Sequence, residues 1–229
     1  MMKPLGLIAA LAITLMGCQA GSASAQKSVE APAANRVADE DAGLKKAVFA
    51  GGCFWCVEAV FSHTKGISAI VSGYHGGSAA TATYAASNTG LTGHAEAVEI
   101  IYDPAVIRYD QVLQIFFSVV ADPTLTDRQG PDIGPQYRAA LVPLSPEQRE
   151  VAAAYLAQMQ ASGKWANPIV TEIEDYIQFY PAEDYHQDYV VRNPSNPYVQ
   201  VWSVPKVEAL ENLFPEFYRA EFLRDFAGE

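Results

Sequence analysis

The chain has 229 residues, of which 50% are hydrophobic and only 18% are charged, so it can bury a sizeable core and is neither disordered throughout nor fibrous. Its formal net charge of -11, from 15 basic and 26 acidic residues, disfavours nucleic acid or an anionic membrane surface as a partner, because both are polyanions. Its 3 cysteines are too few for a disulfide-rich scaffold.

The N-terminus has the pattern of an export signal. A lysine precedes an apolar stretch, residues 5–16, that is too short to span a bilayer, and we predict a signal peptide over residues 1–25. Two processing sites compete there. Leu-Met-Gly-Cys at 15–18 resembles a lipobox, in which Cys18 is the lipid attachment site, while Ala-Ser-Ala at 23–25 fits ordinary secretory cleavage. Either way we predict an exported protein, periplasmic or anchored as an outer-membrane lipoprotein.

The next segment, residues 26–43, is rich in Ala, Ser, Pro and Asn and has no helical or strand period. We therefore predict a flexible tether there, followed by one folded domain over residues 44–225.

The folded part alternates strand and helix patterns. We predict strands over residues 46–50, 67–72, 97–102, 138–142 and 169–174, and helices over residues 53–63, 109–120, 145–160 and 205–222, the last of them broken at Pro215. The third helix opens with a capping box, Ser-Pro-Glu-Gln at 145–148. Up to residue 142 the order is strand, helix, strand, strand, helix, strand. This order predicts an α+β fold, a two-layer ferredoxin-like sandwich with an additional C-terminal strand and helices.

The run Gly-Cys-Phe-Trp-Cys at 52–56 follows the first strand and begins the first helix. The unpaired N–H groups of a first helical turn carry partial positive charge and favour a thiolate, so Cys53 is the candidate nucleophile. A buried apolar cysteine, half of a zinc site and a structural disulfide are the alternatives. Zinc needs two more ligands, and the 4 histidines include no second closely spaced pair, so we predict no metal.

Four further polar residues stand in loops beside the expected strands. Glu96 ends the run Gly-His-Ala-Glu, Asp132 and Tyr137 precede the fourth strand, and Tyr84 follows a Gly-Gly pair. Loops on a rigid scaffold often carry catalytic groups, although a loop acid is more commonly just solvated. The spacing alone does not bring these residues to Cys53.

Four separated motifs, taken together, resemble the type A peptide methionine sulfoxide reductases, and the likeness runs from about residue 45 to residue 217. They are Gly-Cys-Phe-Trp at 52–55, Thr-Gly-His-Ala-Glu at 92–96, Gln-Tyr-Arg at 136–138 and Tyr-Pro-Ala-Glu-Asp-Tyr-His-Gln at 180–187. The resemblance implies reduction of the S epimer of peptidyl methionine sulfoxide without a cofactor. It also implies that Cys53 attacks the sulfoxide sulfur, while Phe54 and Trp55 form an apolar cage for the substrate methyl group.

The resemblance also assigns the acid. It implies that Glu96, aided by the hydroxyls of Tyr84 and Tyr137, protonates the departing oxygen. Asp132 would hydrogen-bond within the pocket, and His186 would be a supporting residue. The chemistry is consistent with this assignment, because a sulfoxide oxygen leaves poorly unless it is protonated, and a carboxylic acid in a partly apolar pocket has a raised pKa.

Cys56 departs from the common family pattern, in which Gly stands at this position and resolving cysteines lie near the C-terminus. No cysteine follows Cys56 here, so we predict that Cys56 resolves a sulfenic acid on Cys53 to a disulfide, which a thioredoxin-like reductant then reduces. Residues three apart on a helix have Cα atoms about 5 Å apart, which a disulfide accepts. The expected substrates are oxidised exported proteins.

Two rival functions share the Cys-x-x-Cys spacing. A thioredoxin-like disulfide oxidoreductase also carries it at a helix start, but such a protein needs a proline loop facing the disulfide, and no suitable X-Pro signal is present. A lipid-anchored metal-binding or scaffold module would use Cys53 and Cys56 as ligands.

Overall fold

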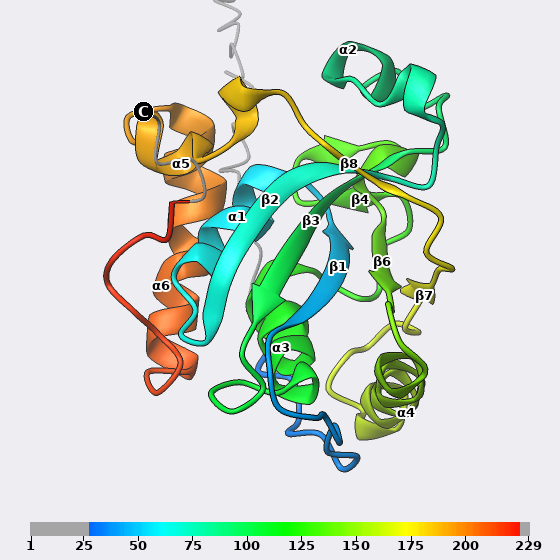
Figure 1. Cartoon of the computed structure of the whole chain (residues 1–229), viewed down its shortest axis with the longest axis vertical. Helices are drawn as coiled ribbons and strands as arrows, with labels where there is room; N and C mark the ends of the chain where they lie inside the picture. Colours follow the sequence, from blue (N-terminus) through cyan, green and yellow to red (C-terminus); the bar gives the residue numbers. More distant parts are fainter. Residues whose placement is uncertain (1–27, 225–229) are drawn as a thin grey trace, which may run out of the picture.

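The computed structural model describes residues 28–224, and a six-stranded sheet in the order β7-β6-β1-β3-β2-β8 forms its centre (Figure 1). The predicted signal peptide and Cys18 lie outside the described residues. A separate two-stranded ribbon pairs β4 with β5. The strand bounds are β1 Lys45–Gly51, β2 Ile67–His75, β3 Ala95–Tyr102, β4 Arg128–Gln129, β5 Asp132–Ile133, β6 Ala139–Val142, β7 Glu172–Ile173 and β8 Phe179–Pro181.

The four central strands confirm the predicted topology. β1 pairs antiparallel with both β3 and β6, and β2 pairs antiparallel with β3, as the split β-α-β plan requires. Two short strands extend the sheet beyond this plan. β7 runs parallel to β6 at one edge, and β8 runs antiparallel to β2 at the other. The C-terminal part of the chain therefore adds to both edges of the sheet.

The helices follow the predicted order with some changes at their ends. Their bounds are α1 Phe54–Ser62, α2 Tyr84–Ser87, α3 Tyr109–Ile115, α4 Pro146–Ser162, α5 Tyr189–Arg192 and α6 Val204–Leu213. The predicted helix over 109–120 is α3 followed by a π-helical turn, Phe116–Val120. A second π-helical turn, Val199–Ser203, leads into α6, which ends just before Pro215, where a break is predicted, and residues 216–222 form no further helix. Within residues 28–224, no helix combines the length and apolar composition needed to cross a membrane.

The main core lies between one face of the sheet and the helices α1 and α3. Phe49 of β1 is at its centre, with its ring centroid 5.5 Å from that of Phe61 in α1 and 5.3 Å from that of Phe116 after α3. The opposite face of the sheet carries mostly small buried side chains, such as Ala50, Ala97 and Ala140. Helix α6 packs beside α1 (Figure 1). The two layers of the predicted sandwich are thus present.

The connection from β1 to α1 is a tight turn that requires glycine. Gly52 has a φ of +83°, and a Cβ atom there would lie 2.5 Å from Cβ of Gln129. A side chain at this position is excluded both by the backbone conformation and by the close neighbour. Cys53 follows as the N-cap residue of α1, so the turn fixes this cysteine at the junction of sheet and helix.

Residues 28–43, the N-terminal strap, are packed against the domain, and the prediction of a flexible tether is wrong for them. Ala31 and Ala38 are buried. Their N–H groups donate to Ser118 Oγ at 2.9 Å and to Asp110 Oδ1 at 3.0 Å. The strap has no helix or strand, so its sequence shows no period. Small buried side chains and hydrogen bonds to side chains of the domain hold it instead.

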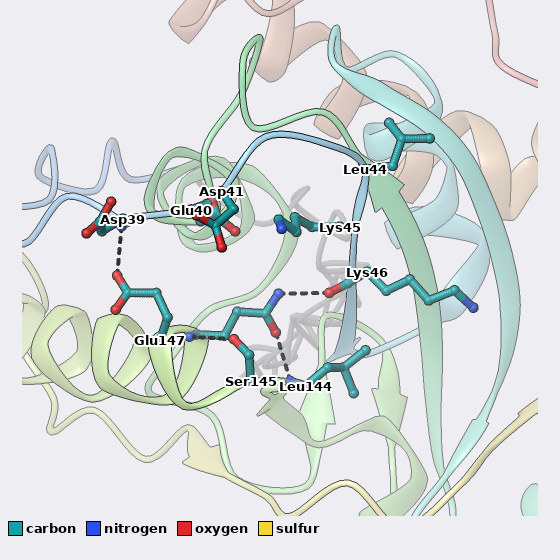
Figure 2. Close-up of a pocket in the computed structure, with 10 residues that line it drawn as sticks. Asp39, Glu40, Asp41, Leu44, Lys45, Lys46, Leu144, Ser145 and Glu147 are labelled. Carbon is teal, nitrogen blue, oxygen red and sulfur yellow. Dashed lines mark hydrogen bonds between the residues drawn. The ribbon is translucent and has the colours of Figure 1, made fainter.

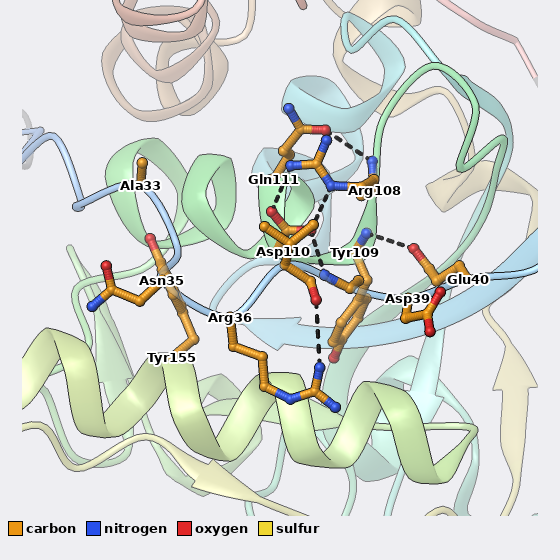
Figure 3. A network of polar contacts seen from close by, with 12 residues as sticks. Ala33, Asn35, Arg36, Asp39, Glu40, Arg108, Tyr109, Asp110, Gln111 and Tyr155 are labelled. Atoms are coloured by element: carbon orange, nitrogen blue, oxygen red, sulfur yellow. Dashed lines mark hydrogen bonds and ion pairs between the residues drawn. The ribbon is translucent and has the colours of Figure 1, made fainter.

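Charged residues of the strap complete its attachment. Glu40 accepts a hydrogen bond from the Tyr102 hydroxyl at 2.5 Å. It accepts another from the Tyr109 N–H at 2.9 Å (Figure 3). Arg36 pairs with Glu147 of α4 at 2.8 Å. These contacts tie the strap to β3, α3 and α4.

Candidate active site

A cavity of about 140 Å³ lies where β1 ends and α1 begins. It gathers Tyr198 together with seven of the residues that the sequence singled out: Cys53, Phe54, Trp55, Tyr84, Glu96, Asp132 and Tyr137. Cys56 and the residues of the fourth motif, His186 among them, do not line it. The side chains come from α1, α2, β3, β5 and the 3-10 turn Pro135–Tyr137. A nucleophile, a carboxyl group, hydroxyl groups and aromatic rings therefore share one small pocket.

Glu96 is the buried acid of this cavity. It lies in β3, only 3% exposed, and its Oε2 accepts a hydrogen bond from the Phe54 N–H at 3.0 Å. Burial raises its pKa to about 8, the Phe54 hydrogen bond opposes this shift, and the charge of Asp132 adds to it. Glu96 is consequently protonated at neutral pH, which is the form a general acid needs.

The two cysteines are both buried, unbridged and in contact through a hydrogen bond between their thiols. Burial raises the pKa of Cys53, and the neighbouring Cys56, Glu96 and Asp132 raise it further. The pKa of Cys56 is lowered to about 6, first by the hydrogen bond from Cys53 and then by Lys206 and Ser203, against the opposing effect of burial. The pKa shifts of the two thiols therefore run in opposite directions, upward for Cys53 and downward for Cys56.

This distribution corrects the prediction that the helix N-terminus favours a thiolate at Cys53. The N–H of Phe54, in the first turn of α1, donates to Glu96. Cys53 itself is the residue that caps the helix, and its side chain makes no capping hydrogen bond. Burial, which disfavours the charged form, outweighs the partial charge of a nine-residue helix.

Hydroxyl groups line the cavity opposite Glu96. Burial raises the pKa of both Tyr84 and Tyr137, so each remains a neutral donor. The Tyr137 hydroxyl donates to Asn88 Oδ1 at 3.2 Å. Asp132 accepts a hydrogen bond from the Tyr198 hydroxyl at 2.5 Å, and its pKa is raised by burial. Two phenols and two carboxyl groups thus surround the position next to Cys53.

Trp55 forms an aromatic wall whose orientation is fixed on two sides. Its Nε1–H donates to His186 Nδ1 at 3.1 Å. Its ring stacks on that of Tyr189, with centroids 3.6 Å apart and planes at 4°. Burial lowers the pKa of His186, which keeps the imidazole neutral and Nδ1 free to accept. His186 therefore has a structural reason for its supporting role, since it holds the indole in place.

Tyr198 and Glu183 are site residues that the sequence reasoning missed as such. Tyr198 lies in a Pro- and Asn-rich stretch outside the four motifs, where no sequence signal marks it. Glu183 lies within the fourth motif and connects two elements, because it accepts from the Tyr74 hydroxyl at 2.8 Å and from the Tyr84 N–H at 2.9 Å. The motif itself was the signal that could have identified Glu183.

A larger cavity, of about 490 Å³, lies away from the cysteines between the strap and the start of α4 (Figure 2). Charged side chains such as Asp39, Glu147 and Lys45 line it, and neither cysteine and no residue of the four motifs does. Among residues 28–224 no three His, Cys, Asp or Glu side chains are grouped closely enough to hold a metal ion. The reactive groups are those of the smaller cavity.

Comparisons with known proteins agree with this chemistry. The family profile described as peptide methionine sulfoxide reductase matches residues 45–217. The chain is 48% identical over 187 residues to peptide methionine sulfoxide reductase MsrA 2 of Synechocystis, covering 82% of this chain and 87% of that protein. It is also 48% identical over 176 residues to MsrA 2 of Mesorhizobium japonicum, covering 77% and 90%.

Two solved structures are similar to the chain. Reduced Mxr1 from Saccharomyces cerevisiae has 31% identity and a TM-score of 0.60, covering 71% of this chain and 93% of that one. Methionine sulfoxide reductase A of Corynebacterium diphtheriae has 30% identity and a TM-score of 0.56, covering 76% and 90%.

Proposed function

The chain belongs to the MsrA family of peptide methionine sulfoxide reductases, and we propose that it repairs exported proteins through a sulfenic acid on Cys53 that Cys56 resolves to a disulfide. The observation that carries the proposal is the placement of Cys53 and the protonated Glu96 in one cavity, with Cys56 hydrogen-bonded to Cys53.

The first half of the reaction takes place in the cavity. The sulfur of Cys53 attacks the sulfoxide sulfur while Glu96 gives its proton to the sulfoxide oxygen, and the thiol of Cys53 releases one proton in return. An S–S bond forms between Cys53 and the substrate sulfur while the sulfoxide S–O bond breaks, and the oxygen leaves as water with the protons from Glu96 and Cys53. A water molecule then attacks the Cys53 sulfur, the S–S bond breaks so that methionine departs, and the proton that this water loses returns to Glu96. The methionine sulfur gains two electrons, and Cys53 loses two and becomes a sulfenic acid. The rings of Phe54 and Trp55 supply an apolar surface for the substrate methyl group.

The second half restores the thiol. Cys56 attacks the sulfenic sulfur of Cys53, the S–O bond breaks, and the oxygen leaves as water after taking up a proton. A dithiol reductant of the thioredoxin class then reduces the Cys53–Cys56 disulfide. In support, the two cysteines are one helical turn apart and are the only cysteines among the described residues.

We propose further that the protein is exported and lipid-anchored at Cys18. Support comes from the apolar stretch over residues 5–16 and the Leu-Met-Gly-Cys sequence at 15–18. Mass spectrometry of the mature N-terminus tests this, since a diacylated Cys18 is expected. A mature chain that begins at Gln26 without lipid contradicts the anchor and leaves export intact.

Reduction of the two epimers of a methionine sulfoxide peptide with dithiothreitol tests the activity. We expect turnover of the S epimer alone, and Cys53→Ser, which keeps a side chain of similar size, should abolish it. Equal turnover of both epimers, or turnover of neither, refutes the function.

The disulfide step has its own test. Cys56→Ser should still release one equivalent of methionine in a single turnover and accumulate a sulfenic acid that dimedone traps on Cys53. It should fail in multiple turnover with a thioredoxin-like reductant. If Cys56→Ser cycles at the wild-type rate with that reductant, Cys56 is only a small core residue.

A further inference from the structure

A second, narrow cavity adjoins the substrate cavity and shares Cys53, Asp132 and Tyr198 with it. Its other walls are formed by side chains that the first half of the reaction does not use: Cys56, Gln129, Gly130, Pro131, Trp202 and Lys206. Cys56 is thus separated from the substrate cavity and faces a different set of groups.

Lys206 is the cation of this second cavity. It lies in the first turn of α6, only 9% exposed, and its Nζ donates to the carbonyl oxygen of Val120 at 2.5 Å. A buried ammonium group is costly unless a negative charge compensates it, and a carbonyl oxygen supplies only a dipole. The acidic groups that share this cavity with Lys206 are Asp132 and the thiols of Cys53 and Cys56.

Two hydroxyl groups complete the surroundings of Cys56. Ser203 Oγ lies 3.2 Å from Cys56 Sγ, and the Tyr198 hydroxyl lies 3.9 Å from it. Ser203 and Lys206 come from the π-helical turn and α6, which pack against α1. A hydroxyl group and an ammonium group on this side favour a negative charge on the Cys56 sulfur.

We propose that Lys206 is the electrostatic partner of the Cys56 thiolate, so that Cys56 attacks as a thiolate when the disulfide forms and departs as a thiolate when the reductant opens it. This inference rests on the proposed function, because it assigns a positioning residue to the disulfide step. It assigns Lys206 no part in the reduction of the sulfoxide.

The geometry also gives the direction of reduction. Cys53 is 8% exposed and lines the substrate cavity, whereas Cys56 is 2% exposed and lies behind it. The thiolate of the reductant therefore attacks the Cys53 sulfur and forms a mixed disulfide there, and the electron pair of the broken S–S bond goes to Cys56. The second thiol of the reductant then attacks the mixed disulfide and releases Cys53. The lowered pKa of Cys56 agrees with its role as leaving group.

The ionisable and hydroxyl groups around Cys56 come from five elements. The negative or acidic ones are Cys53, Glu96 and Asp132, and the groups able to donate are Ser203 and Lys206. The Tyr198 hydroxyl accepts from the Cys56 thiol and donates to Asp132. Lys206 also lowers the pKa of Asp132, so both anions depend on the same ammonium group.

Lys206→Gln tests the inference with the least structural change, because an amide can still donate to the Val120 carbonyl while the charge is lost. Lys206→Arg retains the charge, and Lys46→Met removes an exposed lysine paired with Glu99 and serves as the control. In a Cys53→Ser background, the rate of alkylation of Cys56 by iodoacetamide is followed against pH by mass spectrometry of the Cys56 peptide.

We expect the midpoint of the alkylation profile to rise by about one pH unit or more in Lys206→Gln, because Lys206 lines the same cavity as Cys56 and a nearby opposite charge shifts a pKa by about 1 to 3 units. Lys206→Arg retains the charge, so its midpoint should stay close to that of the wild type. Lys46→Met should leave the profile unchanged. With Cys53 intact, disulfide formation after a single turnover at pH 7 should be slower in Lys206→Gln, by about twofold for a midpoint that rises from about 6 to about 7, because the thiolate fraction of Cys56 falls by that factor.

Two outcomes separate the inference from the function on which it rests. If Lys206→Gln has the wild-type midpoint and the wild-type rate of disulfide formation, Lys206 has no electrostatic role and the inference is overturned. If the wild-type protein releases no methionine, or Cys56→Ser cycles normally, the proposed function fails first. Near-ultraviolet circular dichroism of each variant shows whether it is folded. If Lys206→Gln is not folded, Lys206→Met takes its place as the variant without the charge. A midpoint of Lys206→Met above that of Lys206→Arg then supports the inference, and equal midpoints overturn it.

Discussion

Replacing Glu96 by Gln should have opposite effects on turnover and on stability. The amide retains an acceptor oxygen for the Phe54 N–H at 3.0 Å, so the local hydrogen bond survives. It has no proton to give to the sulfoxide oxygen. A positioned general acid contributes typically 10²- to 10⁴-fold, so turnover should fall by at least about 10²-fold, or about 3 kcal/mol of barrier.

The stability effect follows from the raised pKa of Glu96, about 8 in the folded chain against a usual value of 4.5. Between these pH values the folded state binds more protons than the unfolded state, so the stabilising contribution is complete below pH 4.5 and is lost as pH rises through 8. At pH 7 the difference amounts to about 3 kcal/mol of lost stability. Gln does not ionise and escapes this loss. Glu96→Gln should therefore unfold at a higher denaturant concentration at pH 7 than the wild type.

The assay pairs single-turnover methionine release with urea unfolding, each measured from pH 5 to pH 9. The wild-type rate should fall above about pH 8 as Glu96 ionises, and the stability gap between the two proteins should widen from pH 5 to pH 8. Wild-type rates in Glu96→Gln refute the assignment of the acid. A stability gap that does not change with pH would falsify the raised pKa, even if the rate falls.

Three further predictions test other parts of the structure. Tyr84→Phe and Tyr137→Phe should each lower kcat/KM by less than Glu96→Gln does, because the remaining phenol can still donate. In a steady-state assay, the fold-decrease in kcat/KM of the double variant should exceed the product of the two single fold-decreases. His186→Phe removes the acceptor of the Trp55 N–H. We expect KM to rise by about 3- to 10-fold at nearly constant kcat, which corresponds to the loss of one hydrogen bond. A KM equal to that of the wild type argues against the positioning role. Glu40→Ala leaves two donors without their acceptor and should lower the free energy of urea unfolding by about 1 to 3 kcal/mol without changing turnover.

The sheet and the main helices could be predicted because apolar residues recur along the sequence with the periods of a strand and of a helix. Alternating side chains of β1 and β3 face the two sides of the sheet, and α1 presents Val57, Val60 and Phe61 to the core. The strap has no such period, so its docking could not be predicted. What holds it is a set of single contacts, such as Arg36 with Glu147, between residues 111 apart in the chain.

The candidate site shows the same division. The motifs identified Cys53 and Glu96, because a nucleophile after a glycine turn and an acid beside a strand leave local patterns. The charge on the cysteine pair could not be predicted from the helix N-terminus alone. Lys206 and Cys56 line one cavity, but they are 150 residues apart in the sequence, so no local pattern shows that they are neighbours.

The Cys-x-x-Cys spacing places two sulfur atoms one turn apart on α1, yet in different electrostatic surroundings. Cys53 faces the substrate cavity with Glu96 and Asp132, where negative charge is unfavourable and a neutral sulfur or sulfenic acid is the stable form. Cys56 faces Ser203 and a cationic group, where a thiolate is stable. In the proposed mechanism, oxidation occurs on the sulfur that lines the substrate cavity, and the resolving sulfur beside it is the one whose surroundings favour a thiolate. Because both sulfurs are carried by one helical turn, closing the disulfide requires no distant segment of the chain to move into the site, and we expect its rate to depend on the charge of Cys56 rather than on chain motion.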